Sequence, residues 1–308
     1  MNPATIRIAA ALAAVYVIWG TTYLGIKFAL EGFQPYFQMG TRFTVAGAML
    51  FAWLMLRNHA APTVRQWLHS AILGLLMLGG GTSLVAVAEQ TISSGAVTVL
   101  IAFTPLWMAV LSGLFGSAPR RLEWCAVAIG TLGVGVLTLG QEFRASPGGT
   151  FAIVAATFFW ALGSLLSKRL DVPSGPMGFA AEMLAGGLVL LAISAALGEP
   201  WTLVASASAW FAWTYLVVFG SIVAFSAYMY LVHTVSPTLA ASYAYVNPLV
   251  ALAVGAWLGG EHIAPQTLAA LLLVFAAVAL LAWANRQPVP VRPPRPAASP
   301  RRGPVSDR

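Results

Sequence analysis

Short connections carrying glycine, proline or charge divide the sequence into apolar runs long enough to cross a membrane. A helix needs roughly 17 to 25 apolar residues to span about 30 Å of hydrocarbon. Hydrophobic residues make up 59% of the chain and charged residues only 8%, whereas a soluble domain carries roughly 25% charged residues. We therefore expect an all-α membrane protein with ten transmembrane helices, at about residues 8–30, 36–56, 66–88, 93–116, 121–140, 149–167, 176–197, 209–231, 237–258 and 264–284.

The chain also repeats itself. Trp19 and Lys27 recur 141 residues later as Trp160 and Lys168, and the Pro-Leu pair of the fourth run recurs in the ninth. Each copy holds five runs, an odd number, so the second copy must enter the membrane from the opposite face, which makes an inverted repeat. The predicted organisation is an N-terminus at 1–7, two five-helix repeats at 8–140 and 149–285, and a tail at 286–308.

The distribution of charge predicts the orientation. Thirteen of the sixteen lysine and arginine residues fall on the side of the two termini in a ten-span arrangement, and such an excess is typical of the cytoplasmic side. We expect a multi-pass membrane protein with both termini cytoplasmic. The opposite side receives Lys27 and Arg144, with five acidic residues near it: Glu31, Glu89, Glu142, Glu199 and Glu261.

The C-terminal tail is rich in proline and arginine and has too few apolar residues for a core, so we expect it to be disordered and cytoplasmic. Its arginines are consistent with a solvated segment that sets orientation, and also with binding to anionic lipid headgroups. The net charge of +7 lies mostly in this tail and in short loops, which argues against a nucleic-acid partner.

The sequence lacks the residue patterns that several classes of protein function require. The chain has one cysteine and four scattered histidines without an H-E-x-x-H pattern, and it has no G-x-x-x-x-G-K-[S/T] loop. These patterns would be needed for a zinc site or a phosphate-binding loop, and no nucleophile, base and acid can be assembled for hydrolysis. We expect no enzyme activity, no metal and no cofactor.

Aromatic and polar pairs supply a candidate binding site for a small molecule. Residues four apart share one helix face, and three such pairs lie in the first, sixth and ninth runs: Trp19 with Tyr23, Trp160 with Ser164, and Tyr243 with Asn247. They would form a mostly apolar pocket with a few hydrogen-bonding groups, as small-molecule sites do. The alternative is plain packing or an aromatic belt at the membrane interface.

Four further residues are candidates for gating or coupling. Arg42 and Glu182 are charges well inside the second and seventh runs, and intramembrane charges mark functional sites unless they snorkel to an interface. Pro105 and Pro248 interrupt the fourth and ninth runs at matched positions, where each frees a backbone carbonyl. A hinge and a simple packing kink are both consistent with these prolines.

The order and doubling of several motifs resemble the EamA-type branch of the drug/metabolite transporter superfamily. They are Trp19-Gly20, Arg42-Phe43, Thr104-Pro105-Leu106, Asn247-Pro248-Leu249 and Gly260-Glu261. One departure is Gly116-Ser117-Ala118 in the first half, where the second half has Gly259-Gly260-Glu261. The resemblance implies a cavity between the first, third, fourth, sixth, eighth and ninth helices, which adds Ser83 and Tyr228 to the candidate contacts and disfavours Arg42 and Glu182 as direct contacts.

The resemblance implies an inner-membrane exporter of small metabolites that works by alternating access. Amino acids are the expected substrates, because aromatic walls with a few polar groups suit them. Efflux of drugs, nucleosides or sugars is the alternative, and a non-transporting scaffold or sensor is a third possibility. The sequence is consistent with a monomer or a homodimer, and it leaves the driving force open.

Overall fold

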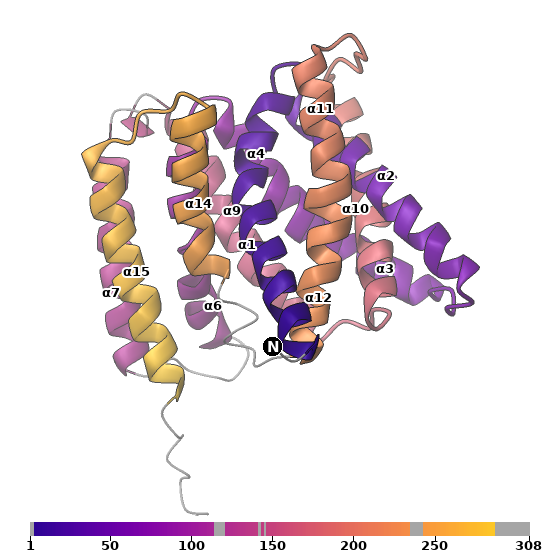
Figure 1. Ribbon diagram of the computed structural model, residues 1–308, viewed down its shortest axis with the longest axis horizontal. Helices are drawn as coiled ribbons and strands as arrows, with labels where there is room; N and C mark the ends of the chain where they lie inside the picture. Colours follow the sequence, from indigo (N-terminus) through magenta and orange to yellow (C-terminus); the bar gives the residue numbers. More distant parts are fainter. Residues whose placement is uncertain (1–2, 114–120, 141–142, 145, 235–242, 287–308) are drawn as a thin grey trace, which may run out of the picture.

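The chain forms helices only, within the part that the structure describes. A computed structural model defines residues 3–113, 121–140, 143–144, 146–234 and 243–286 (Figure 1). The first half holds α1 (Pro3–Ala29), α2 (Pro35–Leu56), α3 (Val64–Leu73), the π-helix η1 (Gly74–Ser83), α4 (Leu84–Glu89), α5 (Ser94–Ile101), α6 (Thr104–Ser112) and α7 (Arg121–Thr138). The second half holds α9 (Pro147–Ser167), α10 (Pro176–Ala196), α11 (Ala207–Tyr215), the π-helix η3 (Leu216–Val223), α12 (Ala224–Thr234), α14 (Tyr243–Leu258) and α15 (Pro265–Arg286).

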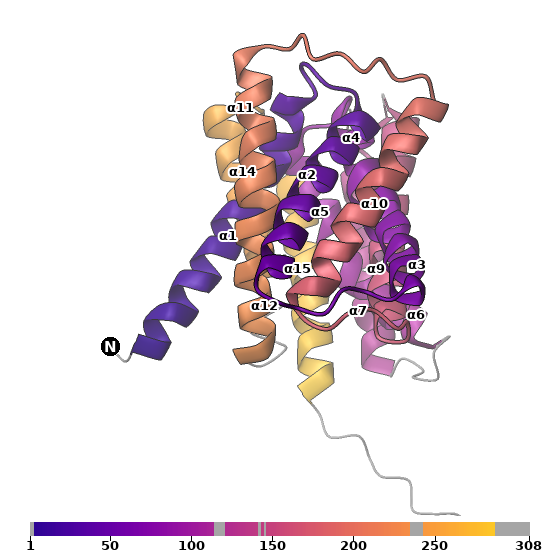
Figure 2. The ribbon, with the colours of Figure 1, turned by 90° about the vertical axis from the view of Figure 1, so that its right-hand side faces the viewer.

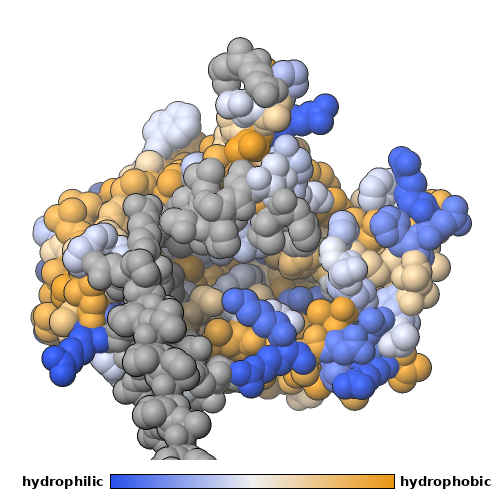
Figure 3. All heavy atoms as spheres, turned by 90° about the horizontal axis from the view of Figure 1, so that it is seen from below, coloured by the Kyte–Doolittle hydropathy of each residue, from blue (hydrophilic) through white to orange (hydrophobic). Residues whose placement is uncertain are grey.

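The helices are those of a multi-pass membrane protein. Seven helical stretches in the described ranges are long and apolar enough to cross a bilayer, and two shorter apolar helices lie at Val246–Leu258 and Pro265–Leu280. In each long stretch, between 33% and 65% of an apolar segment of 18 residues is buried inside the protein. The remainder includes side chains such as Phe211, which is 77% exposed. This apolar outer surface fits contact with lipid, and hydrophilic residues form separate patches on the end seen in Figure 3.

Helix starts follow local chemistry. Proline is the first residue of α2, α9, α10 and α15, a position where its missing N–H costs nothing. Before α3, the Thr63 side chain accepts a hydrogen bond from the Gln66 N–H, and the Gln66 side chain accepts one from the Thr63 N–H. Ser206 caps α11 by accepting from the Ala209 N–H. The breaks predicted between the apolar runs are therefore built into the sequence.

Packing between the halves is reciprocal. Helix α1 packs against α11, η3, α12 and α14 of the second half, whereas α9 packs against η1, α4, α5 and α6 of the first half. Helices α2 and α10 pack side by side, and so do α7 and α15, which form one edge of the molecule (Figures 1 and 2). Each half thus supplies most of the neighbours of the first helix of the other.

Glycines permit the closest helix contacts. A Cβ atom added to Gly74 in η1 would lie 2.5 Å from the Cα of Gly186 in α10, and one added to Gly47 in α2 would lie 2.5 Å from the backbone nitrogen of Leu184. Small residues are the usual means by which membrane helices approach this closely. Here they draw α2, α10 and η1 together.

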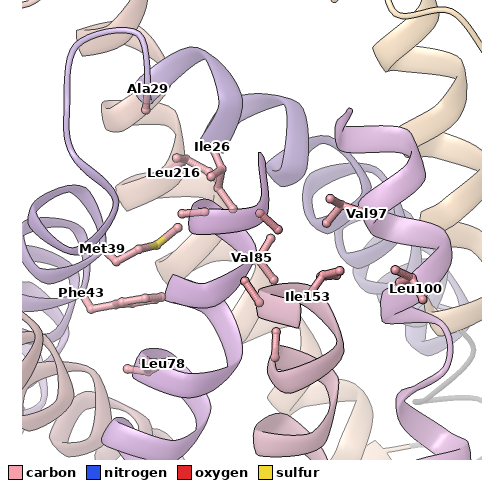
Figure 4. Packing of buried hydrophobic residues seen from close by; sticks show 14 of the residues in the cluster. Ile26, Ala29, Met39, Phe43, Leu78, Val85, Val97, Leu100, Ile153 and Leu216 are labelled. Atoms are coloured by element: carbon pink, nitrogen blue, oxygen red, sulfur yellow. The ribbon is translucent and has the colours of Figure 1, made fainter. Parts of the chain in front are cut away.

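The main core lies where the two halves meet. Figure 4 shows Ile26 of α1, Phe43 of α2 and Ile153 of α9 pointing toward a common interior. Leu216 of η3, from the second half, joins the same buried cluster. Because these residues come from both halves, the core cannot be divided into two separate domains.

Two features of the backbone differ from uniform helices. The fourth predicted run is broken between α5 and α6, just before Pro105. The third and eighth runs each contain a π-helical segment, at Gly74–Ser83 and Leu216–Val223. Such segments are rare and often occur at functional sites. They occupy similar places in the two halves, although the sequence did not predict them.

Candidate functional site

An aromatic cluster joins α1 to α12 and α14. The Trp19 ring lies with its centroid 5.2 Å from those of Phe225 and Tyr228 and 4.9 Å from that of Tyr243, and the two tyrosine rings lie 5.6 Å apart. The Trp19 Nε1–H donates to the Gly220 carbonyl at 3.2 Å. Three predicted contacts, Trp19, Tyr228 and Tyr243, are therefore brought together.

Asn247 and Tyr23 extend this cluster. Tyr243, Asn247 and Val250 share a face of α14 by their spacing, and that face meets α1, since a Cβ on Gly20 would lie 2.6 Å from the Cβ of Val250. Asn247 is 5% exposed, and its Oδ1 has no hydrogen-bond partner among the described residues. Tyr23 interacts electrostatically with Tyr243. The cluster thus contains a buried acceptor that is free to receive a hydrogen bond.

The remaining predicted contacts lie elsewhere. Trp160 packs on η1, where a Cβ on Gly81 would lie 2.9 Å from its ring. The Ser164 hydroxyl donates to the Trp160 carbonyl at 2.7 Å, and the Ser83 hydroxyl donates to the Leu78 carbonyl at 2.9 Å. Both hydroxyls are satisfied within their own helices. Trp160 and Trp19 therefore belong to separate groups of contacts.

The two intramembrane charges have different surroundings. Arg42 is 4% exposed, donates from Nε to the Ser221 hydroxyl at 3.0 Å and lies 4.8 Å from the centroid of the Phe43 ring. Across the described ranges, no carboxylate lies within ion-pair distance of Arg42. Glu182 is half-buried on α10, and its backbone carbonyl faces the close contact at Gly74. The structure does not pair these two residues.

The two prolines differ in effect. Pro105 lies in the first turn of α6, directly after the break that follows α5, and the Thr104 hydroxyl donates to the Ile101 carbonyl at 2.6 Å. Pro248 lies inside α14, which continues through it. The residues that precede α14, 235–242, lie outside the described part of the chain. A helix break is therefore seen at Pro105 only.

Besides the aromatic cluster, a cluster of charged residues lies at the end of the molecule opposite the N-terminus (Figure 1). Glu261, in the connection between α14 and α15, accepts hydrogen bonds from Lys27 Nζ at 2.6 Å, from the Ser94 N–H and hydroxyl at 3.0 Å each, and from the Gly95 N–H at 3.1 Å. Burial alone would raise the pKa of Glu261, but the bonds from Lys27, Ser94 and Gly95 hold that pKa below its usual value. One carboxylate therefore ties the end of α1 to the start of α5.

Glu89 lies beside this ion pair. It ends α4, is 3% exposed, and neither carboxyl oxygen has a hydrogen-bond partner in the described ranges. It interacts electrostatically with Glu261 and Lys27 and with Tyr23. A cavity of about 400 Å³ has Lys27, Glu89, Glu261 and His262 in its wall. Sequence reasoning did not select this cluster, although it placed Lys27, Glu89 and Glu261 at one membrane face.

Comparisons with known proteins agree with the helical architecture. A crystal structure at 20% identity superposes with a TM-score of 0.63, covering 92% of this chain and 99% of its own. That likeness concerns the fold.

Relatives of similar length include two that are named as transporters. The uncharacterized inner membrane transporter YedA of Escherichia coli K12 is 44% identical over 270 residues, which covers 87% of this chain and 88% of YedA. The uncharacterized transporter YdfC of Bacillus subtilis is 26% identical, covering 84% and 86% of the two chains. PecM of Dickeya dadantii is 25% identical, covering 86% and 88%.

The EamA-like transporter family matches this chain twice, over residues 6–139 and 147–283. The two matches together extend over most of the sequence, including most of α1, all of α14, Lys27 and Glu261. As the resemblance in the sequence implied, the chain is a membrane transporter that belongs to the EamA-like transporter family.

Proposed function

We propose that this protein exports small metabolites, amino acids in particular, across the bacterial inner membrane by alternating access. In this proposal ten transmembrane helices form two inverted five-helix repeats, residues 8–140 and 149–285, with both termini in the cytoplasm. The reciprocal packing of α1 and α9 supports the inverted arrangement. Two equivalent packings of inverted halves would give an inward-open and an outward-open state.

The observation that carries the substrate class is the buried amide oxygen of Asn247, which has no donor among the described residues. It lies on the α14 face that bears Tyr243, whose ring contacts Trp19. A protonated amino group would supply the missing donor, and hydrogen bonds to charged groups contribute about 1.5–3 kcal/mol. The aromatic rings would pack against the apolar part of an amino acid.

The proposed substrate contacts are Trp19, Tyr23, Tyr228, Tyr243 and Asn247, with Ser83, Trp160 and Ser164 on the facing side of the path. The proposed gating or coupling residues are Arg42, Glu182, Pro105 and Pro248. Substrate and lipid are the proposed partners.

Counterflow in proteoliposomes tests the proposal. Purified protein is reconstituted with each unlabelled amino acid inside, and uptake of the same radiolabelled amino acid is measured. We expect exchange for a subset of amino acids. Absence of exchange for all of them would refute the amino-acid assignment, and exchange of hydrophobic cations, nucleosides or sugars instead would favour the alternative substrates. If none of these compounds exchanged, the proposal of metabolite export would fail.

Asn247→Leu tests the site itself. This variant keeps the number and branching of the side-chain heavy atoms and removes a buried polar atom that lacks a partner in the described ranges, so we expect the folded state to be about as stable as the wild type. Loss of a hydrogen bond to an amino group should raise the KM for exchange about tenfold or more. Trp257→Ala, at an 82% exposed position of the same helix, is the matched control. An unchanged KM in Asn247→Leu would contradict the role of Asn247.

A further inference from the structure

Glu89 differs from the other charged groups at its end of the molecule. Glu199 accepts hydrogen bonds from the backbone N–H groups of Tyr36 and Phe37, and Glu261 accepts four. Glu89 is buried to 3% exposure and accepts none within the described ranges. Burying a carboxylate without donors is expensive, and a carboxyl group in that position is commonly neutral.

Among the described residues, Lys27 is the lysine or arginine side chain in the surroundings of Glu89. Helix α4 packs against α1, α2, α5, α9 and η1, and neither α5, α9 nor η1 carries an ionisable side chain. Tyr23 and Lys27 face Glu89 from α1. The two ionisable groups of α2 are engaged elsewhere, since Tyr36 lies at Glu199 and Arg42 bonds Ser221.

The α14–α15 connection completes these surroundings with Glu261, and His262 lies in the wall of the same cavity. Lys27 is therefore the cation that an ionised Glu89 would attract.

Lys27 is positioned to respond to ionisation of Glu89. Its side chain is 35% exposed, whereas that of Glu261 is 6% exposed, and both form the cavity wall together with Glu89. A lysine side chain is flexible and carries three donors. If Glu89 were ionised, two carboxylates would compete for one ammonium group.

We propose that Glu89 is a proton-binding site of this transporter, and that release of its proton draws Lys27 away from Glu261. The proton passes between the Glu89 carboxyl and water in the cavity, and no other bond is made or broken. When the ion pair between Lys27 and Glu261 breaks, one interaction that holds the end of α1 against the α14–α15 connection is lost. This inference rests on the proposed transport function, because it makes the tie a proton-controlled step of export.

The first test needs no substrate. Infrared difference spectra of the protein in lipid vesicles are recorded as the pH is raised, and the carboxylic C=O stretch is followed. We expect a titrating band that disappears in Glu89→Gln and persists in Glu31→Gln, which changes an exposed glutamate. The absence of a band specific to Glu89 would overturn the proposal, whatever the substrate is.

The neighbouring charges should move this band in opposite directions. Lys27→Met removes the cation that favours ionised Glu89, so the band should titrate at higher pH. Glu261→Gln removes a competing anion and frees Lys27, so the band should titrate at lower pH. Equal titrations in the wild type and both variants would overturn the Lys27 exchange, because a merely buried carboxyl group would not respond in this way.

Transport provides the second test. For an amino acid that the wild type exchanges, Glu89→Gln should retain counterflow at equal pH and lose accumulation driven by a pH gradient. Unchanged gradient-driven accumulation would refute coupling through Glu89. If the wild type exchanges no amino acid, the proposed function fails, while the infrared experiment still decides whether Glu89 binds a proton.

Discussion

The four hydrogen bonds at Glu261 predict an unequal effect of removing the two members of its ion pair. Breaking a buried pair by removing one partner costs about 3–5 kcal/mol. Lys27 is 35% exposed, so solvent screens the pair and the cost falls to about 2–4 kcal/mol for Glu261→Gln. Lys27→Met should cost only about 0.5–1.5 kcal/mol, because Ser94 and Gly95 still donate to Glu261.

A double-mutant cycle in mixed detergent micelles measures this difference. The free energy of unfolding is obtained from SDS titrations of the wild type, both single variants and the double variant. We expect a coupling energy of about 1 kcal/mol between Lys27 and Glu261. The reasoning would be refuted by a coupling energy of zero together with equal losses in the two single variants.

The same cluster predicts a pH dependence. Burial favours a higher pKa for folded Glu261, but the bonds from Lys27, Ser94 and Gly95 outweigh burial and hold the pKa below its usual value of 4.5. The unfolded state therefore binds more protons as the pH falls. The stabilisation by Glu261 is therefore complete above about pH 4.5 and is lost as the pH falls through the lower pKa of the folded state. Wild type and Glu261→Gln should converge in stability on acidification. A constant difference between them would contradict the lowered pKa.

Two further substitutions test the packing and the intramembrane charge. Gly74→Ala would place a Cβ 2.5 Å from the Cα of Gly186. It should destabilise the protein by about 1–3 kcal/mol, as measured by SDS unfolding. Gly135→Ala is the control and should be neutral or slightly stabilising, because a Cβ at Gly135 meets nothing within 4 Å. Arg42→Met should raise the midpoint of thermal unfolding, because it removes a buried charge that has no ion-pair partner in the described ranges. Such a charge is costly in a membrane. A lower midpoint would mean that the hydrogen bond from Arg42 to Ser221 outweighs this cost.

Much of the helical order could be predicted because hydrophobic length and proline are local signals. The predicted runs at 36–56 and 176–197 match α2 and α10 closely, since Pro35 and Pro176 fix where each helix begins. The count of ten spans remains a prediction. The π-helical segments were missed because they depend on tertiary packing: η1 passes so close to α9 that a Cβ on Gly80 would lie 2.6 Å from the Phe159 ring. The spacing of residues within one apolar run carries no information about how closely another helix packs against it.

The candidate site was predictable in part. Aromatic spacing selected Trp19 and Tyr243, which do contact each other. Pairing of Lys27 with Glu261 could not be read from the sequence, because topology places charges at a membrane face without giving their neighbours. Glu89 was missed for a related reason, since its burial is decided by helices from both halves of the chain.

The reciprocal packing of the halves bears on how the protein is made. Trp19 bonds to a carbonyl 201 residues further along the chain, and Lys27 bonds to a carboxylate 234 residues further along. During synthesis, α1 therefore enters the bilayer long before its neighbours in the second half exist, and lipid must cover the face that packs against them in the meantime. Lipid tails are as apolar as leucine, so this delay costs little. The first helix of the chain is thus among the last to be locked in place, and assembly is completed only after the second half has been inserted.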